Sequence, residues 1–224
     1  KTSSHLEIQA YRADQVFFWI YKKKVKSFSE MKNLGSKIRE MLENNFWISS
    51  IEKIEKTHSK DGSIKYLFML EDGKFTESVF MSHKRHNTLC VSSQVGCGMG
   101  CDFCMTGKIG FIRNLEASEI VDQVLTVSQD LPEKQKLRNI VFMGMGEPLH
   151  NYQNLMNSLE ILTDEHGLNF SQRRITVSTS GLIPKIQRFG NESLKTNLAI
   201  SLNGVTNEIR SKLMPINNSY DLEC

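Results

Sequence analysis

From about residue 88, the sequence alternates short apolar segments with longer segments of helical period. Apolar strands that alternate with helices predict a parallel sheet with right-handed crossovers. The expected strands are 88–95, 138–144, 173–181 and 196–204. The expected helices are 117–130, 151–165 and 182–189, with a last helix beginning near Thr206. Four βα units are too few to close a barrel, so we predict an α/β fold with a partial (βα) barrel.

Both ends of the sequence lead us to expect a longer protein. The last residues, PINNSYDLEC, directly follow the fourth βα unit, where the edge of a parallel sheet would be left open. The first residues, KTSSHLEIQ, contain neither an initiator Met nor the apolar core of a signal peptide. We therefore expect the barrel to be C-terminally truncated here and residues to be missing in front.

Two smaller regions precede the barrel. Residues 9–46 carry two apolar stripes at helical spacing, and Ser36 is the expected N-cap of the second helix. The stripes consist of Val16, Phe17, Trp19 and Ile20, and of Leu34, Ile38, Met41 and Leu42. Residues 49–83 contain two Asp-Gly pairs between three short strands, which predicts a β-meander. The predicted domains are a helical accessory domain (1–48), a β-meander linking region (49–86) and the partial barrel (87–224).

The composition is that of an ordinary soluble globular protein, with 39% hydrophobic and 24% charged residues among 224. The longest apolar run, 16–21, is too short to span a bilayer. We therefore expect a cytoplasmic monomer with no membrane partner. The net charge of +3 permits an RNA partner without requiring one. Local basic clusters, which usually form a solvated face, are Lys22-Lys23-Lys24 with Lys26, Lys84-Arg85, and Arg173-Arg174.

Cysteine spacing gives the sharpest chemical signal. The stretch GCGMGCDFCMTG places Cys97, Cys101 and Cys104 within eight residues, directly after the first barrel strand. That position is the carboxyl-terminal face, where such folds carry their chemistry. A structural zinc site usually takes four ligands, and neither His83 nor His86 has a conventional spacing for the fourth. Three thiolates on one loop suit an iron–sulfur cluster with one iron left open to a small molecule.

The cysteine motif resembles that of the radical S-adenosylmethionine (SAM) superfamily. A set of flanking blocks is similar to the RlmN/Cfr family of RNA adenine methyltransferases. These blocks are LCVSSQVGC, CMTGKIGFIRNL, VFMGMGEPL, SQRRITVSTSGLIP, AISLN and MPIN. The N-terminal YRADQVFFWIY also resembles the accessory helical domain of that family. Together the blocks cover nearly the whole chain.

The resemblance implies a methyltransferase that uses SAM, a 4Fe–4S cluster and an external electron donor. It would methylate C2 of an adenosine in 23S rRNA and in some tRNAs. The target carbon is an sp2 ring carbon without a lone pair, so a radical route is needed. In the family, a methyl-cysteine intermediate delivers the methyl group. A second cysteine takes the ring proton and resolves the covalent RNA adduct through a disulfide bond.

The matching blocks also imply roles for individual residues. Cys97, Cys101 and Cys104 would be the cluster ligands. The SAM contacts would be Gly146, Glu147, Ser178, Ser201, Leu202 and Asn203. Cys90 matches the resolving cysteine, and Glu77 matches a glutamate that the family uses as a proton acceptor.

Plainer interpretations exist for several of these residues. Glu147 fits an ordinary strand-to-helix turn, Cys90 a small buried hydrophobe, and Glu77 a surface charge. Family members often have His where this chain has Asn203. The methyl-carrying cysteine is expected outside this chain, and Cys224 does not match it. We therefore expect this chain alone to bind cluster and SAM poorly and to be inactive.

Two alternative functions remain from the sequence. One is a C8-specific adenine methyltransferase of the same family, although SSQVGC and STSG favour C2. The other is a non-catalytic module that binds RNA through its basic helices and holds a structural zinc ion with its cysteines.

Overall fold

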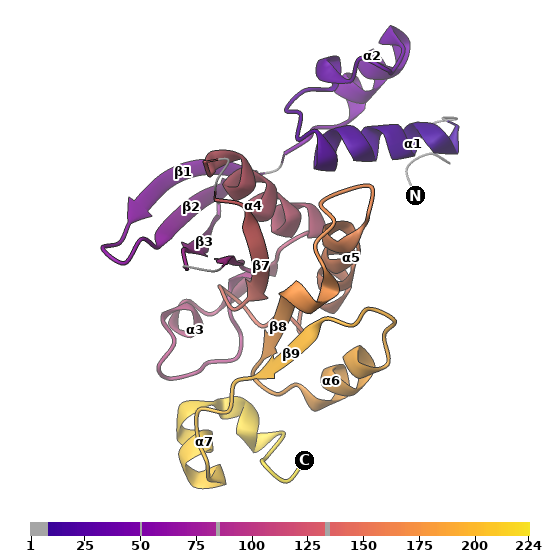
Figure 1. Cartoon of the computed structure of the whole chain (residues 1–224). Coiled ribbons are helices and arrows are strands. Elements are labelled where there is room, and N and C mark those ends of the chain that lie inside the picture. Colours follow the sequence, from indigo (N-terminus) through magenta and orange to yellow (C-terminus); the bar gives the residue numbers. More distant parts are fainter. Residues whose placement is uncertain (1–8, 50, 84–85, 133–134) are drawn as a thin grey trace.

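The computed structural model describes residues 9–49, 51–83, 86–132 and 135–224 (Figure 1). It contains one seven-stranded sheet in the order β1-β2-β3-β4-β7-β8-β9 and a two-stranded sheet, β5-β6. In Figure 1, the helices α1 and α2 lie at one end of the molecule and α7 lies at the other.

The first half of the large sheet is antiparallel. It consists of β1 (Ile51–His58), β2 (Ile64–Leu70), β3 (Phe75–Met81) and β4 (Asn87–Cys90). Gly62 and Gly73 have φ values of +86° and +75°, as expected in the turns after the two Asp residues. The three strands of the predicted meander are confirmed. However, β3 hydrogen-bonds with β4, so the meander and the barrel strands form a single sheet.

The second half of the sheet is parallel, as predicted. Its strands are β4, β7 (Leu137–Phe142), β8 (Ile175–Thr179) and β9 (Asn197–Ile200). The helices between and after them are α4 (Ala117–Asp130), α5 (Tyr152–Thr163), α6 (Ile183–Gly190) and α7 (Asn207–Leu213). Buried residues of α4 and α5 form one hydrophobic core with alternate residues of the strands, such as Leu89, Ile140 and Val177. The predicted α/β class is therefore confirmed.

The expected strand 88–95 is wrong in its second half. β4 ends at Cys90, and β5 (Gln94–Gly96) pairs instead with β6 (Phe111–Asn114). The reason lies at Ser92, whose N–H donates to Gln123 Oε1 at 2.9 Å and whose carbonyl accepts from Gln123 Nε2 at 3.0 Å. A side chain from α4 thus takes both backbone groups that would continue the strand. The short helix α3 (Met105–Ile109) was also not predicted.

The N-terminal helical region has its own small core. It consists of α1 (Ala10–Phe17), the π-helical turn η1 (Phe18–Lys22), the 3-10 turn η2 (Phe28–Glu30) and α2 (Ser36–Asn45). The predicted stripes pack in this core except for Phe17: Leu34 and Leu42 are buried, and Val16 and Ile38 pack against the buried residues. The N-cap prediction is wrong by one residue. Gly35 is the N-cap, with no side-chain hydrogen bond, and Ser36 is the first helical residue.

Every helix in the described parts of the chain is too short or too polar to cross a lipid bilayer. The expected basic cluster Lys84-Arg85 lies outside the described residues. The predicted domain boundaries after residues 48 and 86 stay predictions.

Candidate functional site

Several predicted site residues share one face of the large sheet. Directly paired residues of neighbouring strands point to the same side. Cys90 pairs with Val79 on one side and with Val141 on the other, and Val141 pairs with Thr176. Glu77 lies two residues from Val79 on β3, and Ser178 lies two residues from Thr176 on β8. Residues two apart on a strand point to the same face. Glu77, Cys90 and Ser178 therefore lie on the face opposite to α4 and α5.

Cys90 does not belong to the hydrophobic core. Its neighbours Leu89 and Val91 are buried against the helices, whereas Cys90 is half-buried on the opposite face. Burial raises the pKa of the Cys90 thiol, and a hydrogen bond from the backbone of Met143 lowers it in part. The thiol is therefore protonated at neutral pH. The interpretation of Cys90 as a small core hydrophobe is wrong.

Glu77 lies two residues along β3 from Val79, the residue that pairs with Cys90. Its side chain is 40% exposed, and its carboxylate accepts from Lys65 Nζ at 3.1 Å. Its backbone carbonyl accepts from Ser92 Oγ at 2.6 Å, which fixes β3 to the segment that leads to the cysteine loop. The catalytic role of Glu77 stays a prediction.

The cysteine loop is anchored at both ends. Gly96 has φ +72°, and a Cβ on it would lie 1.8 Å from the carbonyl oxygen of Gly110. This glycine is required because Cys97 N–H donates to that same oxygen at 2.9 Å. At the other end, Asp102 N–H donates to Leu213 O at 2.9 Å. The β5-β6 pair and α7 therefore hold the loop at the carboxyl end of the sheet.

The three thiols of the loop interact with one another and with a buried carboxylate. Burial raises the pKa of Cys97, and the charges of Glu147 and Cys104 raise it further. Burial also raises the pKa of Cys101, followed by the charges of Cys97, Cys104 and Glu147. Thiolates form here most readily when a cation binds, because metal ligation requires the deprotonated form. This soft sulfur donor set fits an iron–sulfur cluster.

All five cysteines are among the residues that the structure describes, and all are free. The disulfide bond that the resemblance implied therefore has no support in the structure. Within the described part of the chain, no three His, Cys, Asp or Glu side chains are arranged around a single metal ion.

Glu147 is the buried carboxylate at this site, with 3% of the residue exposed. Its Oε2 accepts from Ser180 N–H and Ser180 Oγ, at 2.7 and 2.8 Å, and its Oε1 accepts from Leu149 N–H at 3.1 Å. A carboxylate has about four acceptor positions, so roughly one remains. Among the described residues, no lysine or arginine forms an ion pair with Glu147. A buried carboxylate without a cation is costly, which points to a positively charged ligand.

Gly146 shapes the turn that carries Glu147. It has φ +101°, and a Cβ on it would lie 2.5 Å from Gln94 Cβ. Gln94 is fully buried, and its Oε1 accepts from Glu147 N–H at 2.9 Å. Its Nε2 lies 2.8 Å from Asn114 Oδ1 and 3.0 Å from His150 Nδ1. Sequence reasoning missed Gln94. The signal that could have identified Gln94 was its polar side chain inside an expected apolar strand.

The remaining SAM-contact predictions lie at the ends of β8 and β9. The hydroxyl oxygens of Ser178 and Ser201 are 3.2 Å apart, so the structure brings these two residues together. Leu202 is exposed. Asn203 has φ +52°, and its side-chain amide donates to Met214 Sδ at 3.4 Å. The backbone of Asn203 therefore makes a turn, while its side chain is held by Met214.

The family follows from comparison with known proteins. Residues 91–223 match the family model described as the radical SAM superfamily. The chain belongs to the radical SAM superfamily. Residues 3–48 match a second model, described as a ribosomal RNA large subunit methyltransferase N-terminal domain. These matches extend from the helical region to the last helix.

Individual relatives agree with this family. The chain is 49% identical over 216 residues to a probable dual-specificity RNA methyltransferase RlmN of Staphylococcus saprophyticus, and 48% identical to that of Staphylococcus carnosus. Each match covers 96% of this chain but 59% of the relative. The crystal structure of a radical SAM methyltransferase from Sphaerobacter thermophilus matches with a TM-score of 0.93 and 40% identity. It covers 99% of this chain and 65% of that one. The predicted resemblance to the RlmN/Cfr family is confirmed.

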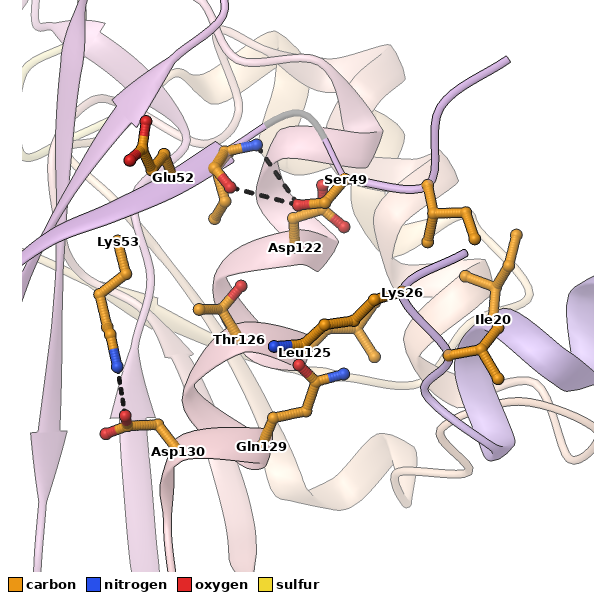
Figure 2. Close-up of a pocket in the computed structure, with 13 residues that line it drawn as sticks. Ile20, Lys26, Ser49, Glu52, Lys53, Asp122, Leu125, Thr126, Gln129 and Asp130 are labelled. Atoms are coloured by element: carbon orange, nitrogen blue, oxygen red, sulfur yellow. Dashed lines mark hydrogen bonds and ion pairs between the residues drawn. The ribbon is translucent and has the colours of Figure 1, made fainter. Parts of the chain in front are cut away.

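A separate cavity of about 400 Å³ lies between the helical region, β1 and α4. Figure 2 shows Ile20 and Lys26 on the helical side and Asp122, Leu125 and Gln129 on α4. None of the predicted site residues lines it. The predicted site of this superfamily is therefore distinct from this cavity.

Proposed function

We propose that this chain carries the cluster and SAM site of a methyltransferase that methylates C2 of a specific adenosine in 23S rRNA and in some tRNAs. One observation carries the proposal: three free thiols lie on a single loop, and the charge of a buried carboxylate, Glu147, which has no ion-pair partner among the described residues, raises the pKa of two of them. The three thiols suit an iron–sulfur cluster, and the carboxylate suits the positively charged end of SAM.

The cofactor site would use these groups directly. Cys97, Cys101 and Cys104 would hold three irons of a 4Fe–4S cluster, which leaves the fourth iron for the amino-acid end of SAM. Glu147 would accept a hydrogen bond from the ammonium group of SAM at its remaining position. Gly146, Ser178 and the segment 201–203 would contact the rest of the molecule. When reduced by an external donor, the cluster supplies the electron that starts radical chemistry on SAM.

Cys90 and Glu77 would act on the RNA. Both lie on the face of the sheet opposite to α4 and α5, on the same side as Ser178. In the proposed reaction, a methyl-cysteine intermediate delivers the methyl group, and Cys90 takes the ring proton of the covalent adduct and resolves it. Glu77, on the neighbouring strand β3, serves as a proton acceptor. Burial raises the pKa of Cys90, so its thiol must give up its own proton before it can take the ring proton, and Glu77 is the proposed acceptor of that first proton.

RNA would be bound through the helical region and its lysines. The match of residues 3–48 to a ribosomal RNA methyltransferase domain supports this partner. Burial lowers the pKa of Lys24, and the charge of Lys136 lowers it further, so cations from the helical region and the barrel lie close together. Such a cluster suits phosphates. The target base would be flipped out of its stack toward the cluster.

The decisive experiment is mass spectrometry of rRNA and tRNA from cells that carry the complete gene and from cells in which it is deleted. We expect 2-methyladenosine that is absent in the deletion. Finding 8-methyladenosine instead would assign the protein to the C8-specific branch. If neither nucleoside depends on the gene, the proposed activity is wrong.

The cofactor is tested separately by anaerobic purification of the gene product. We expect a brown protein that contains iron and sulfide. A colourless protein that contains zinc would favour the non-catalytic RNA-binding module.

A further inference from the structure

A single buried arginine connects the two loops that follow β8 and β9. Arg210, in α7, is 4% exposed. Its Nη2 donates to Ser180 O at 2.6 Å, and its Nε donates to Leu202 O at 3.2 Å. Its Nη1 donates to Asn217 Oδ1 at 2.6 Å. Arg210 is an isolated charge in the sequence, because its hydrogen-bond partners lie up to 30 residues away.

Both loops are shaped to admit this side chain. Gly181 has φ +117°, and a Cβ on it would lie 3.1 Å from Arg210 Nη2. A Cβ on Gly204 would lie 2.8 Å from the backbone of Arg210. Glycine at each position allows the close approach. In Figure 1, α7 lies below the carboxyl end of β9, where these loops emerge.

Arg210 brings a positive charge near the buried carboxylate without touching it. Its hydrogen-bond acceptors are carbonyl and amide oxygens, and a guanidinium keeps its charge in such surroundings. Ser180 lies between the two charges. Its carbonyl accepts from Arg210, while its N–H and hydroxyl donate to Glu147. One residue therefore links a buried cation to a buried anion.

We infer that Arg210 is a positioning residue for the amino-acid end of SAM. It fixes Ser180, and Ser180 in turn orients Glu147 so that its free acceptor position meets the ammonium group. This inference rests on the proposed function, because it assumes that SAM binds at Glu147.

The test compares two ligands on the cluster-loaded product of the complete gene. SAM carries the ammonium group, whereas 5′-methylthioadenosine keeps the adenosine and lacks the amino-acid end. Arg210→Lys shortens the side chain and loses the forked geometry. We expect it to weaken SAM binding by about tenfold or more, while 5′-methylthioadenosine binding and iron content stay unchanged. Lys212→Met, at an exposed position on the same helix, is the matched control and should bind both ligands as wild type does.

Each outcome has a distinct meaning. Equal SAM affinity in Arg210→Lys and wild type would overturn the inference, and so would an equal loss of both ligands, which indicates general loosening. If wild type holds iron but binds no SAM, the proposed function itself fails. Should Arg210→Lys not fold, Ser180→Ala decides, because it removes only the hydroxyl bond to Glu147. Unchanged SAM affinity in Ser180→Ala would then refute the inference.

Discussion

The carboxylate of Glu147 accepts two hydrogen bonds from Ser180, one from its N–H at 2.7 Å and one from its hydroxyl at 2.8 Å. These bonds join the turn after β7 to the turn after β8. They also use neutral donors only, so the negative charge remains uncompensated by the described residues. A carboxylate held rigidly in this way is prepared for a cation that arrives from outside the chain.

Glu147→Gln should therefore weaken SAM binding while the cluster is retained. The amide keeps the size of the side chain but removes the negative charge that we propose binds the ammonium group of SAM. We expect a loss of about 10- to 100-fold in affinity, measured by calorimetry on the anaerobic, cluster-loaded protein. Glu160→Gln, on the exposed side of α5, is the control. Wild-type affinity in Glu147→Gln would show that the ammonium group of SAM binds elsewhere.

Substitution of the five cysteines should give three different combinations of iron content and methylated product. Alanine at Cys97, Cys101 or Cys104 is expected to abolish the iron content of the anaerobically purified protein, because each thiolate is a proposed cluster ligand. Cys90→Ala should retain iron and lose methylated product, since Cys90 lies on the strand and not on the loop. Cys224→Ala, which is exposed, should match wild type in both assays. A full iron content in Cys101→Ala would contradict the assignment.

Gly146→Ala should destabilise the fold. The added Cβ would lie 2.5 Å from Gln94 Cβ, and φ +101° is strained for any residue with a side chain. Gln94 is buried and hydrogen-bonded, so it has little room to move. We expect a loss of about 3 kcal/mol in unfolding free energy, measured by urea denaturation of the apoprotein. Gly190→Ala meets nothing within 4 Å and should be nearly neutral. Equal stability of both variants would refute this account of the turn.

Local periodicity predicted most of the fold. The expected helix 117–130 coincides with α4, because its apolar residues recur at helical spacing and face the sheet. The Asp-Gly pairs likewise located the meander turns. The break after Cys90 was not predictable in this way. It depends on Gln123, whose side chain reaches across 31 residues to take both backbone groups of Ser92.

The residues of the candidate site also divide into those that the sequence predicted and those that it did not. The cysteine spacing is a local pattern and predicted Cys97, Cys101 and Cys104, whereas Glu147 was predicted only through the resemblance of the flanking blocks to a known family. Gln94 and Arg210 hold this site through partners that lie far along the chain. In the sequence they are an isolated amide and an isolated charge, and their burial becomes visible only in the folded structure.

Asp130 connects the C-terminus of α4 to the first strand of the sheet. Its carboxylate accepts from Lys53, from Lys56 Nζ at 2.6 Å and from Tyr66 OH at 2.9 Å. Figure 2 shows the pair with Lys53. A bulge between Lys53 and Glu55 shifts the register of β1, so that two lysines three positions apart reach the same carboxylate. Partial burial alone would raise the pKa of Asp130, but these hydrogen bonds outweigh it and lower the pKa to about 2.

Asp130→Asn should therefore destabilise the protein in a pH-dependent manner. The folded pKa of about 2 lies below the ordinary value of 3.8, so the stabilisation is fully present above about pH 4 and is lost as the pH falls through 2. We expect wild type to exceed the variant by about 1 kcal/mol at pH 7, a difference that high salt reduces. Urea denaturation between pH 7 and pH 2 measures this gap. Glu43→Gln, exposed on α2, should show none. A gap that stays constant with pH would exclude the charge of Asp130 as its source.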